Sequence, residues 1–147
     1  MRSENEMKLS LLSRSSNESF ARVAVASFIA QLDPTVEEIN DIKTAVSEAV
    51  TNCIVHAYRD RIDTIYITVS IYENRNVRIV IRDRGCGIDD VGKAMEPLFT
   101  TAGGERAGLG FAVMESFMDK LSVRSKPGKG TTVTMTKQLS FRARSNG

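Results

Sequence analysis

The stretch IKTAVSEAVTNCIVHAY, residues Ile42–Tyr58, has the spacing of an amphipathic helix. It continues a segment that opens with Thr35-Val-Glu-Glu38, a pattern typical of a capping box with Thr35 as N-cap and Glu38 as the third helical residue. No Gly or Pro interrupts the chain from Thr35 to about Ala57, so we predict one long helix over this range. Its predicted buried side chains recur at helical spacing and include Ile39, Ile42, Val46, Val50 and Cys53.

Three polar residues of this helix, Glu48, Asn52 and His56, follow one another at intervals of four and are predicted to share one face. The small residues Ala45 and Ala49 are expected to leave room beside them. A carboxylate can accept a proton, and an amide oxygen is a ligand that suits Mg²⁺. The alternative is an ordinary solvated face of an amphipathic helix.

The chain on either side of the long helix alternates between helical and strand periodicity. A first helix is expected over Phe20–Ile29, where Phe20, Val23, Ala24 and Phe28 recur at helical spacing after the polar cap residues 13–17. The other expected elements are a strand over Lys8–Leu12, a hairpin over Thr64–Tyr72 and Val77–Asp83, helices over Asp90–Met95 and Leu109–Asp119, and strands over Leu121–Ser125 and Thr131–Gln138 around the turn Pro127–Gly130. This order predicts an α+β fold with helices on one face of a mostly antiparallel sheet.

Composition is that of an ordinary globular protein, with 147 residues, 41% hydrophobic and 26% charged, so we expect a single domain over 1–147. The absence of a long apolar run and of a signal peptide, and the presence of only two cysteines, predict a soluble cytoplasmic protein without a membrane partner. The net charge is +2, but no acidic residue follows Asp119. We interpret the basic end, about residues 139–147, as a solvated tail and expect no direct nucleic-acid contact, because Phe141 is the single aromatic residue there.

Two glycine motifs follow the long helix. Asp83-Arg-Gly-Cys-Gly87 ends a predicted strand, where glycines let the backbone approach a flat ligand and the aspartate can accept a hydrogen bond from an exocyclic amine. Gly108-Leu-Gly110 is predicted to open the last helix, whose free N–H groups suit phosphate oxygens. The alternatives are an ordinary turn and a flexible loop. The chain lacks a Walker A loop and GxGxxG, and its single histidine, His56, argues against a Ser-His-Asp triad.

Taken in order, Glu48-Ala-Val-Thr-Asn52, Asp83–Gly87 and Gly108–Gly110 resemble the N, G1 and G2 boxes of the gyrase, Hsp90, histidine-kinase and MutL ATP-binding superfamily. The stretches NESFARVAVASFIAQLDPT, IKTAVSEAVTNCIVHAY, EPLFTT and GLGFAVMESFMD are similar to the anti-sigma F factor family of spore-forming bacteria. The resemblance extends from about Met7 to Gln138 and implies a two-layer α/β sandwich of the Bergerat type, with a mixed, mostly antiparallel sheet covered on one face by helices.

The resemblance also implies a function. Family members are homodimeric, cytoplasmic Mg-ATP-dependent serine/threonine protein kinases, transferases that bind and inhibit a sporulation sigma factor. They phosphorylate a serine of its anti-anti-sigma factor and so regulate transcription. The alternatives are an anti-sigma kinase directed at the stress-response sigma factor, and an ATP-gated sigma-binding switch with little catalysis. A histidine kinase is disfavoured, because no phosphoacceptor helix precedes the ATP boxes.

Carried onto this chain, the resemblance makes Glu48 the general base or hydroxyl-orienting carboxylate and Asn52 the magnesium ligand. Arg106 is the second expected catalytic residue and neutralises phosphate charge. The expected ATP-binding residues are Asn52, Asp83, Gly85, Gly87, Thr100, Thr101, Gly108, Leu109, Gly110 and Thr131. A lid over about residues 95–107 would close on the triphosphate, so that positioning and charge neutralisation supply most of the rate.

The chain departs from the family pattern at two places. Thr101-Ala-Gly-Gly-Glu-Arg106 replaces a longer, Lys-Pro-containing lid, and Ala57 stands where a glycine often follows the histidine. Arg22, on the first helix, is expected to contact a protein partner, because this helical surface helps to form the docking face in the family. A solvated helix arginine is the alternative for Arg22.

Overall fold

The computed structural model describes residues 2–95 and 105–141, without the side chains of residues 93 and 105–108. Its elements run in the order β1 (Asn5–Leu12), α1 (Ser16–Ile29), η1 (Ala30–Leu32), α2 (Val36–Asn52), η2 (Cys53–Ala57), β2 (Thr64–Ile71), β3 (Asn76–Arg82), α3 (Val91–Ala94), α4 (Glu105–Phe117), β4 (Lys120–Lys126) and β5 (Gly130–Gln138). Each expected element is present, which confirms the α+β class.

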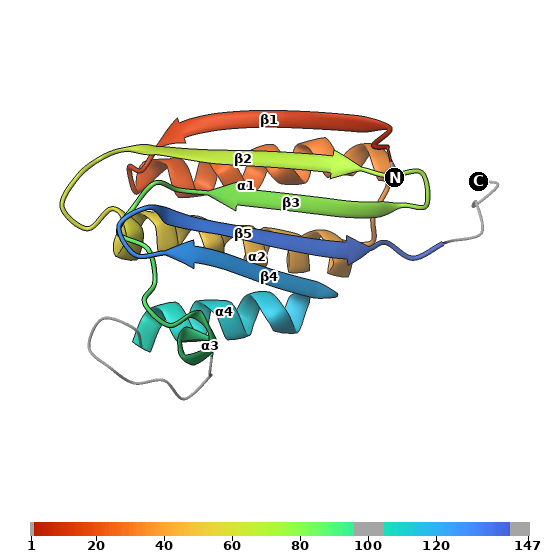
Figure 1. Ribbon diagram of the computed structural model, residues 1–147. Coiled ribbons are helices and arrows are strands. Elements are labelled where there is room, and N and C mark those ends of the chain that lie inside the picture. The colour runs from red at the N-terminus through yellow and green to blue at the C-terminus, as the bar shows by residue number, and fades with distance from the viewer. Residues whose placement is uncertain (1, 96–104, 142–147) are drawn as a thin grey trace.

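The five strands form one sheet in the order β1-β2-β3-β5-β4, and all four pairings are antiparallel. The expectation of a mixed sheet is therefore wrong for the described strands. Helices α1, α2 and α4 cover one face of this sheet and leave the other face open (Figure 1). No helix among the described residues is long and apolar enough to cross a membrane.

The core lies between the sheet and the helices, because alternate strand residues point inward and meet the helix faces. Ile65, Ile67 and Val69 of β2 are buried in this way, as are their counterparts on β3. Helix α1 buries Ala21, Val25 and Ile29, whereas Phe20 and Val23 are 56% and 51% exposed. The helical spacing of Phe20 and Val23 was a correct sign of a helix but does not mark its buried face.

Helix α2 begins with the predicted capping box. The Thr35 hydroxyl accepts a hydrogen bond from the Glu38 N–H at 3.0 Å, and the Glu38 carboxylate accepts one from the Thr35 N–H at 2.8 Å. The other Glu38 oxygen accepts a hydrogen bond from the Ser140 N–H at 2.7 Å. Burial raises the pKa of Glu38, but the hydrogen bonds from Thr35 and Ser140 outweigh it, so the pKa lies below its ordinary value.

The end of the described chain is anchored. Leu139 is fully buried and its N–H donates to the Arg75 carbonyl at 3.0 Å, and Ser140 is held by Glu38. The expected solvated tail therefore does not include residues 139 and 140, because an apolar side chain at 139 completes the core. Residues 142–147 lie outside the described part.

Candidate functional site

The helix that begins at Val36 reaches Ala57, as predicted, but only its residues to Asn52 are α-helical. From Cys53 to Ala57 the backbone widens into a π-helical turn. A π-turn contains more residues than an α-turn, so His56 does not continue the α-helical spacing of Glu48 and Asn52. Ala45 and Ala49 are buried in the core and so do not open space beside the stripe, contrary to expectation.

Glu48 and Asn52 instead face helix α4. A Cβ atom placed on Gly110 would lie 3.2 Å from Glu48 Oε2 and 3.2 Å from both terminal atoms of the Asn52 amide. The missing side chain at Gly110 therefore lets α4 approach the two polar groups. Among the described residues, the Asn52 Nδ2 atom is buried and lacks a hydrogen-bond partner. A buried donor without a partner is costly in a protein, so this atom marks a place where a polar ligand fits.

Helix α4 begins at Glu105, three residues before the expected start at Gly108. The N–H groups without an intrahelical partner therefore belong to the turn that begins at Glu105, and Gly110 lies deeper in the helix. Gly108 and Leu109 also lie within α4, and the Leu109 side chain is exposed. Thr100 and Thr101 lie outside the described residues with most of the expected lid, and the side chain of Arg106 is not described.

Asp83 forms the second part of the site, at the end of β3. Its Oδ1 atom accepts hydrogen bonds from the Gly85 N–H at 2.9 Å and the Thr131 N–H at 3.1 Å. Among the described residues, the one donor to its Oδ2 atom is the weak thiol of buried Cys53, at 3.6 Å. Oδ1 is thus saturated, whereas Oδ2 can accept a further hydrogen bond from a ligand amine.

Burial raises the pKa of Asp83 above its ordinary value, and the hydrogen bonds from Gly85, Thr131 and Cys53 only partly offset this effect. Burial, together with the Asp83 charge, also raises the pKa of the Cys53 thiol well above its ordinary value. Cys53 therefore stays a neutral thiol that packs beneath the carboxylate. A desolvated acid beside a saturated backbone cradle is typical of a specific binding site.

The two glycines of this motif are required by close contacts. A side chain at Gly85 would collide with the Ala57 carbonyl at the end of the π-turn, and Gly87 has φ +76° and lies against the Lys126 carbonyl. The Cys86 N–H donates to the Ala57 carbonyl at 3.1 Å. Gly85 leaves room for the Ala57 backbone and side chain. The alanine that replaces the common glycine at position 57 therefore does not break the contact between the Asp83 motif and the end of the long helix.

Thr131 lies directly beside Asp83 and is buried, as expected of a site residue. Its hydroxyl is 2.8 Å from that of Ser125, which also accepts from the Ile88 N–H at 2.8 Å and donates to the Gly130 carbonyl at 3.0 Å. Tyr58 supports the motif from the other side, because its hydroxyl accepts from the Arg84 N–H and donates to the Thr64 carbonyl, both at 2.6 Å.

Ser125 and Tyr58 were not predicted as site residues. No local motif marks them, since each becomes important only when β4, or the turn after α2, packs against Asp83.

A small cavity of about 260 Å³ opens between α1 and α2 beside Glu48. Its lining residues are Arg22, Asn40, Lys43, Thr44, Ser47 and Glu48. Arg22 lies 3.8 Å from the Glu18 carboxylate and 3.4 Å from the Ser19 hydroxyl, and Ser47 donates to Glu18. The Arg22 Nε atom is buried without a partner among the described residues. The Arg22 side chain therefore forms part of the cavity wall and is not freely solvated.

No group of three or more His, Cys, Asp or Glu residues that could hold a metal ion exists within residues 2–95 and 105–141. The site therefore offers a metal few protein ligands. Mg²⁺ commonly binds through one or two protein oxygens together with substrate phosphates, so Asn52 alone is compatible with it.

Comparisons with known proteins agree with this geometry. Residues 13–137 match the family model described as the histidine kinase-like ATPase domain, which is an ATP-binding fold. The RsbU and RsbW domains of Rv1364c from Mycobacterium tuberculosis align with a TM-score of 0.70 at 22% identity, over 95% of this chain and 34% of that one. A blue-light activated histidine kinase from Erythrobacter litoralis aligns with a TM-score of 0.59 at 24% identity, over 80% of this chain and 40% of that one. At these identities the two structures show the fold alone.

Curated relatives are much closer in sequence. The anti-sigma F factor of Caldanaerobacter subterraneus is 61% identical over 95% of this chain and 97% of that protein. The anti-sigma F factors of Clostridium novyi and Bacillus velezensis are 57% and 54% identical, each over 93% of this chain and over 96% and 94% of their own lengths. Matches of this extent, on a fold that brings the three sequence motifs to one end, show that the chain belongs to the anti-sigma F factor family.

Proposed function

We propose that this protein is a Mg-ATP-dependent protein serine kinase that also binds and inhibits a sporulation sigma factor, and that its protein substrate is the anti-anti-sigma factor. The observation that carries the proposal is the meeting of Glu48, Asn52 and Gly110, where a carboxylate adjoins a buried amide donor without a partner. A binding module needs a nucleotide pocket but has no use for a carboxylate beside it. A kinase uses such a group to orient and deprotonate the acceptor hydroxyl.

The adenine base is assigned to the Asp83 end of the site. Asp83 Oδ2 accepts a hydrogen bond from the exocyclic amine, while the close backbone turns at Gly85 and Gly87 leave a flat surface for the ring. Thr131 holds Asp83 in this orientation through its N–H. Glu48, Asn52 and the first turn of α4 would then hold the triphosphate end of the nucleotide.

Asn52 would hold the magnesium ion through its amide oxygen, and its Nδ2 atom, buried and without a partner among the described residues, would donate to a phosphate oxygen. Bound Mg-ATP supplies the phosphoryl group and a metal ion that neutralises its negative charge. Glu48 accepts the proton of the substrate serine hydroxyl and orients its oxygen toward the phosphoryl group. Arg106, Thr100 and Thr101 are proposed to neutralise and enclose the phosphates.

Protein partners are proposed to dock on the surface formed by α1 and α2. The cavity beside Glu48 connects this surface to the candidate base, and Arg22 lines it with a buried unpaired Nε atom. A partner carboxylate or backbone carbonyl would satisfy that donor. We also propose that the protein acts as a cytoplasmic homodimer, as the family resemblance implies.

The experiment is phosphoryl transfer from Mg-ATP to the cognate anti-anti-sigma protein, followed by intact mass and by mapping of the phosphoserine. The Glu48→Gln variant is expected to lose transfer by 10²-fold or more while retaining nucleotide. Glu37→Gln is the matched control, because Glu37 is an exposed acid of the same helix.

Equal activity in Glu48→Gln and Glu37→Gln would refute the role of Glu48. No transfer by the wild type, with ATP-dependent sigma-factor binding retained, would replace the kinase by a nucleotide-gated binding switch.

A further inference from the structure

The open face of the sheet carries a one-sided distribution of charge. Residues that point away from the helices occupy alternate strand positions, and the pairing registers align them in rows across the sheet. The basic residues at these positions are Lys8, Arg78, Arg82, Lys120, Arg124 and Lys126. Glu6 is the only acidic residue at the corresponding positions of the described strands, and it lies 3.9 Å from Lys8.

The charge is densest where β3 ends beside the β4–β5 turn. A cavity of about 470 Å³ there is lined by Arg82, Arg84, Arg124, Lys126 and Lys129. The buried carboxylate of Asp83, which also borders it, is already bound to the N–H groups of Gly85 and Thr131. Within the described residues none of these five cations forms an ion pair, although Arg84 attracts the carboxylate of Asp63, so the cavity is suited to anions.

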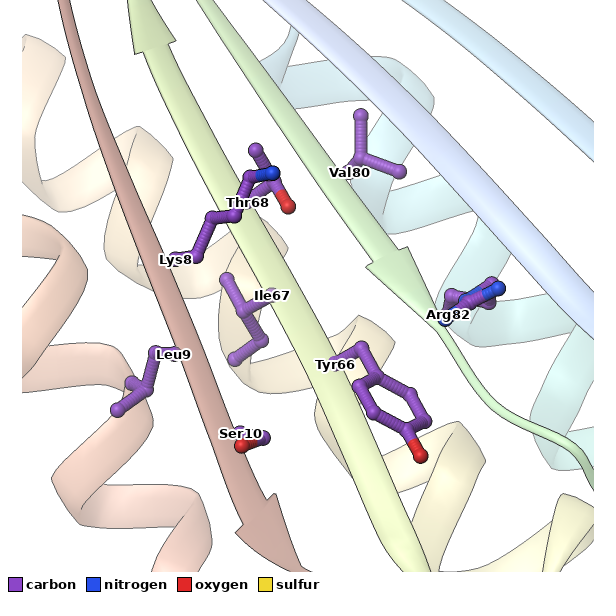
Figure 2. Close-up of a pocket in the computed structure, with 8 residues that line it drawn as sticks. All are labelled: Lys8, Leu9, Ser10, Tyr66, Ile67, Thr68, Val80 and Arg82. Atoms are coloured by element: carbon purple, nitrogen blue, oxygen red, sulfur yellow. The ribbon is translucent and has the colours of Figure 1, made fainter.

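Tyr66 fixes two of these cations. The guanidinium groups of Arg82 and Arg84 lie 4.7 and 5.1 Å from the centre of its ring. Figure 2 shows Tyr66, Arg82 and Lys8 on the face turned away from the helices, around a second hollow of about 310 Å³. Cation–π contacts hold the arginines against the sheet, so a ligand meets charges that are already positioned.

We propose that this open face binds double-stranded nucleic acid through its phosphate backbone, without reading the bases. The basic residues extend over β1, β3 and β4 and are therefore suited to an extended polyanion more than to a single phosphate. Arg124 and Lys126, two residues apart on one strand, are separated by about 6.8 Å and lie on the same face of the sheet, so both can contact the phosphates of one duplex.

Other occupants fit less well. An acidic protein surface would require apolar anchors, whereas threonine, serine and charged side chains dominate the outward positions and Val80 is an exception. Single-stranded binders stack bases on free aromatic rings, but the Tyr66 ring is already engaged by two guanidinium groups. A second copy of this chain, stacked face to face, would bring like charges together.

This basic surface could not be predicted from local sequence. Only about residues 139–147 were interpreted as a basic tail, whereas Lys120, Arg124 and Lys126 belong to β4 and join Arg78 and Arg82 of β3 only in the folded sheet. Their convergence is a consequence of strand order, with β5 alone between the two strands.

The test is fluorescence anisotropy of a labelled 20-base-pair duplex titrated with full-length protein at several salt concentrations. The wild type is expected to bind with an affinity that falls steeply with salt. The double variant Arg124→Ser/Lys129→Ser is expected to weaken binding about tenfold at low salt and to reduce the log–log salt slope by about 1.8, that is 0.9 for each lost phosphate contact. Arg142→Ser/Arg144→Ser, with the same loss of charge, is the matched control and is expected to bind like the wild type.

Nucleotide affinity and melting temperature are measured as controls and are expected to be unchanged in both double variants, so that any difference in duplex affinity reflects the lost charges. The proposal is overturned if the wild type does not bind the duplex at low salt. It is equally overturned if the tail variant loses binding while the face variant retains it, or if a 20-nucleotide single strand binds more tightly than the duplex.

Discussion

Replacing Gly110 with alanine is expected to damage the site while leaving the fold stable. The added Cβ would lie 3.2 Å from Glu48 Oε2 and from both terminal atoms of the Asn52 amide, closer than ordinary van der Waals contact. The two side chains would have to move by a few tenths of an ångström, each at about 0.5–1.5 kcal/mol if it leaves its preferred rotamer. Alanine in place of a helical glycine contributes about 1 kcal/mol in the opposite direction. The free energy of unfolding should therefore change by no more than about 1–2 kcal/mol.

Catalysis should respond more strongly than stability. A displacement of about 1 Å can cost 10²-fold in rate, so a shift of a few tenths of an ångström in Glu48 and Asn52 should reduce phosphoryl transfer by roughly tenfold. The assay is single-turnover transfer to the anti-anti-sigma protein at saturating Mg-ATP, with thermal melting measured in parallel. Affinity for ADP should change less, because the Asp83 end of the site is untouched.

Gly92→Ala is the matched control for Gly110→Ala. Gly92 is an exposed glycine in helix α3, and a Cβ there would lie 3.6 Å from the nearest atom, at ordinary contact distance. The phosphoryl-transfer rate of the Gly92→Ala variant should equal that of the wild type. Wild-type transfer by Gly110→Ala would refute the close approach of α4 to Glu48 and Asn52 as the basis of the site, and a melting temperature lowered by more than about 8 °C would show that the variant acts through the fold.

Two further predictions concern titrating and capping groups. Asp83→Asn should abolish nucleotide binding measured by calorimetry. Burial raises the folded-state pKa of Asp83, so the ionised carboxylate destabilises the folded protein at pH 7. The variant should therefore melt at or above the wild-type temperature at pH 7, and this difference should disappear as the pH falls through that pKa. A lower melting temperature at pH 7 would contradict this assignment. Thr35→Ala should reduce the free energy of unfolding by about 1 kcal/mol in urea, because the Glu38 N–H loses its cap, while ADP affinity is retained. An unchanged urea midpoint would show that the cap contributes nothing.

Much of the fold was predictable because its signals are local. The Thr35 capping box, the alternation of β2 and β3 and the turn around Gly128 each depend on neighbouring residues and were confirmed. The π-turn after Asn52 was not predictable, because no residue between Cys53 and Ala57 disfavours an ordinary helix. It depends on the packing of Ala57 against Gly85, which lies far along the chain.

The site was predicted in part for the same reason. Glu48, Asn52 and Asp83 belong to motifs that can be recognised in sequence, and the fold places Gly110 against the first two. The contacts that orient them, such as Ser125 with Thr131, join strands whose pairing no local pattern reveals. The buried face of α1 was likewise not evident from its largest side chains, since Ala21, Val25 and Ile29 are buried whereas Phe20 is exposed.

The strand order has a consequence for synthesis of the protein. β5, the last strand to be made, lies inside the sheet between β3 and β4, and Leu139 just beyond it fills the core. Until this strand leaves the ribosome, β4 is not connected to the sheet through β5, and the Asp83 carboxylate lacks the hydrogen bond from the Thr131 N–H. The Asp83 part of the nucleotide site is therefore complete only once β5 has paired with β3. A chain truncated before β5 would lack the strand that joins β3 to β4, the Leu139 side chain of the core and the Thr131 hydrogen bond to Asp83.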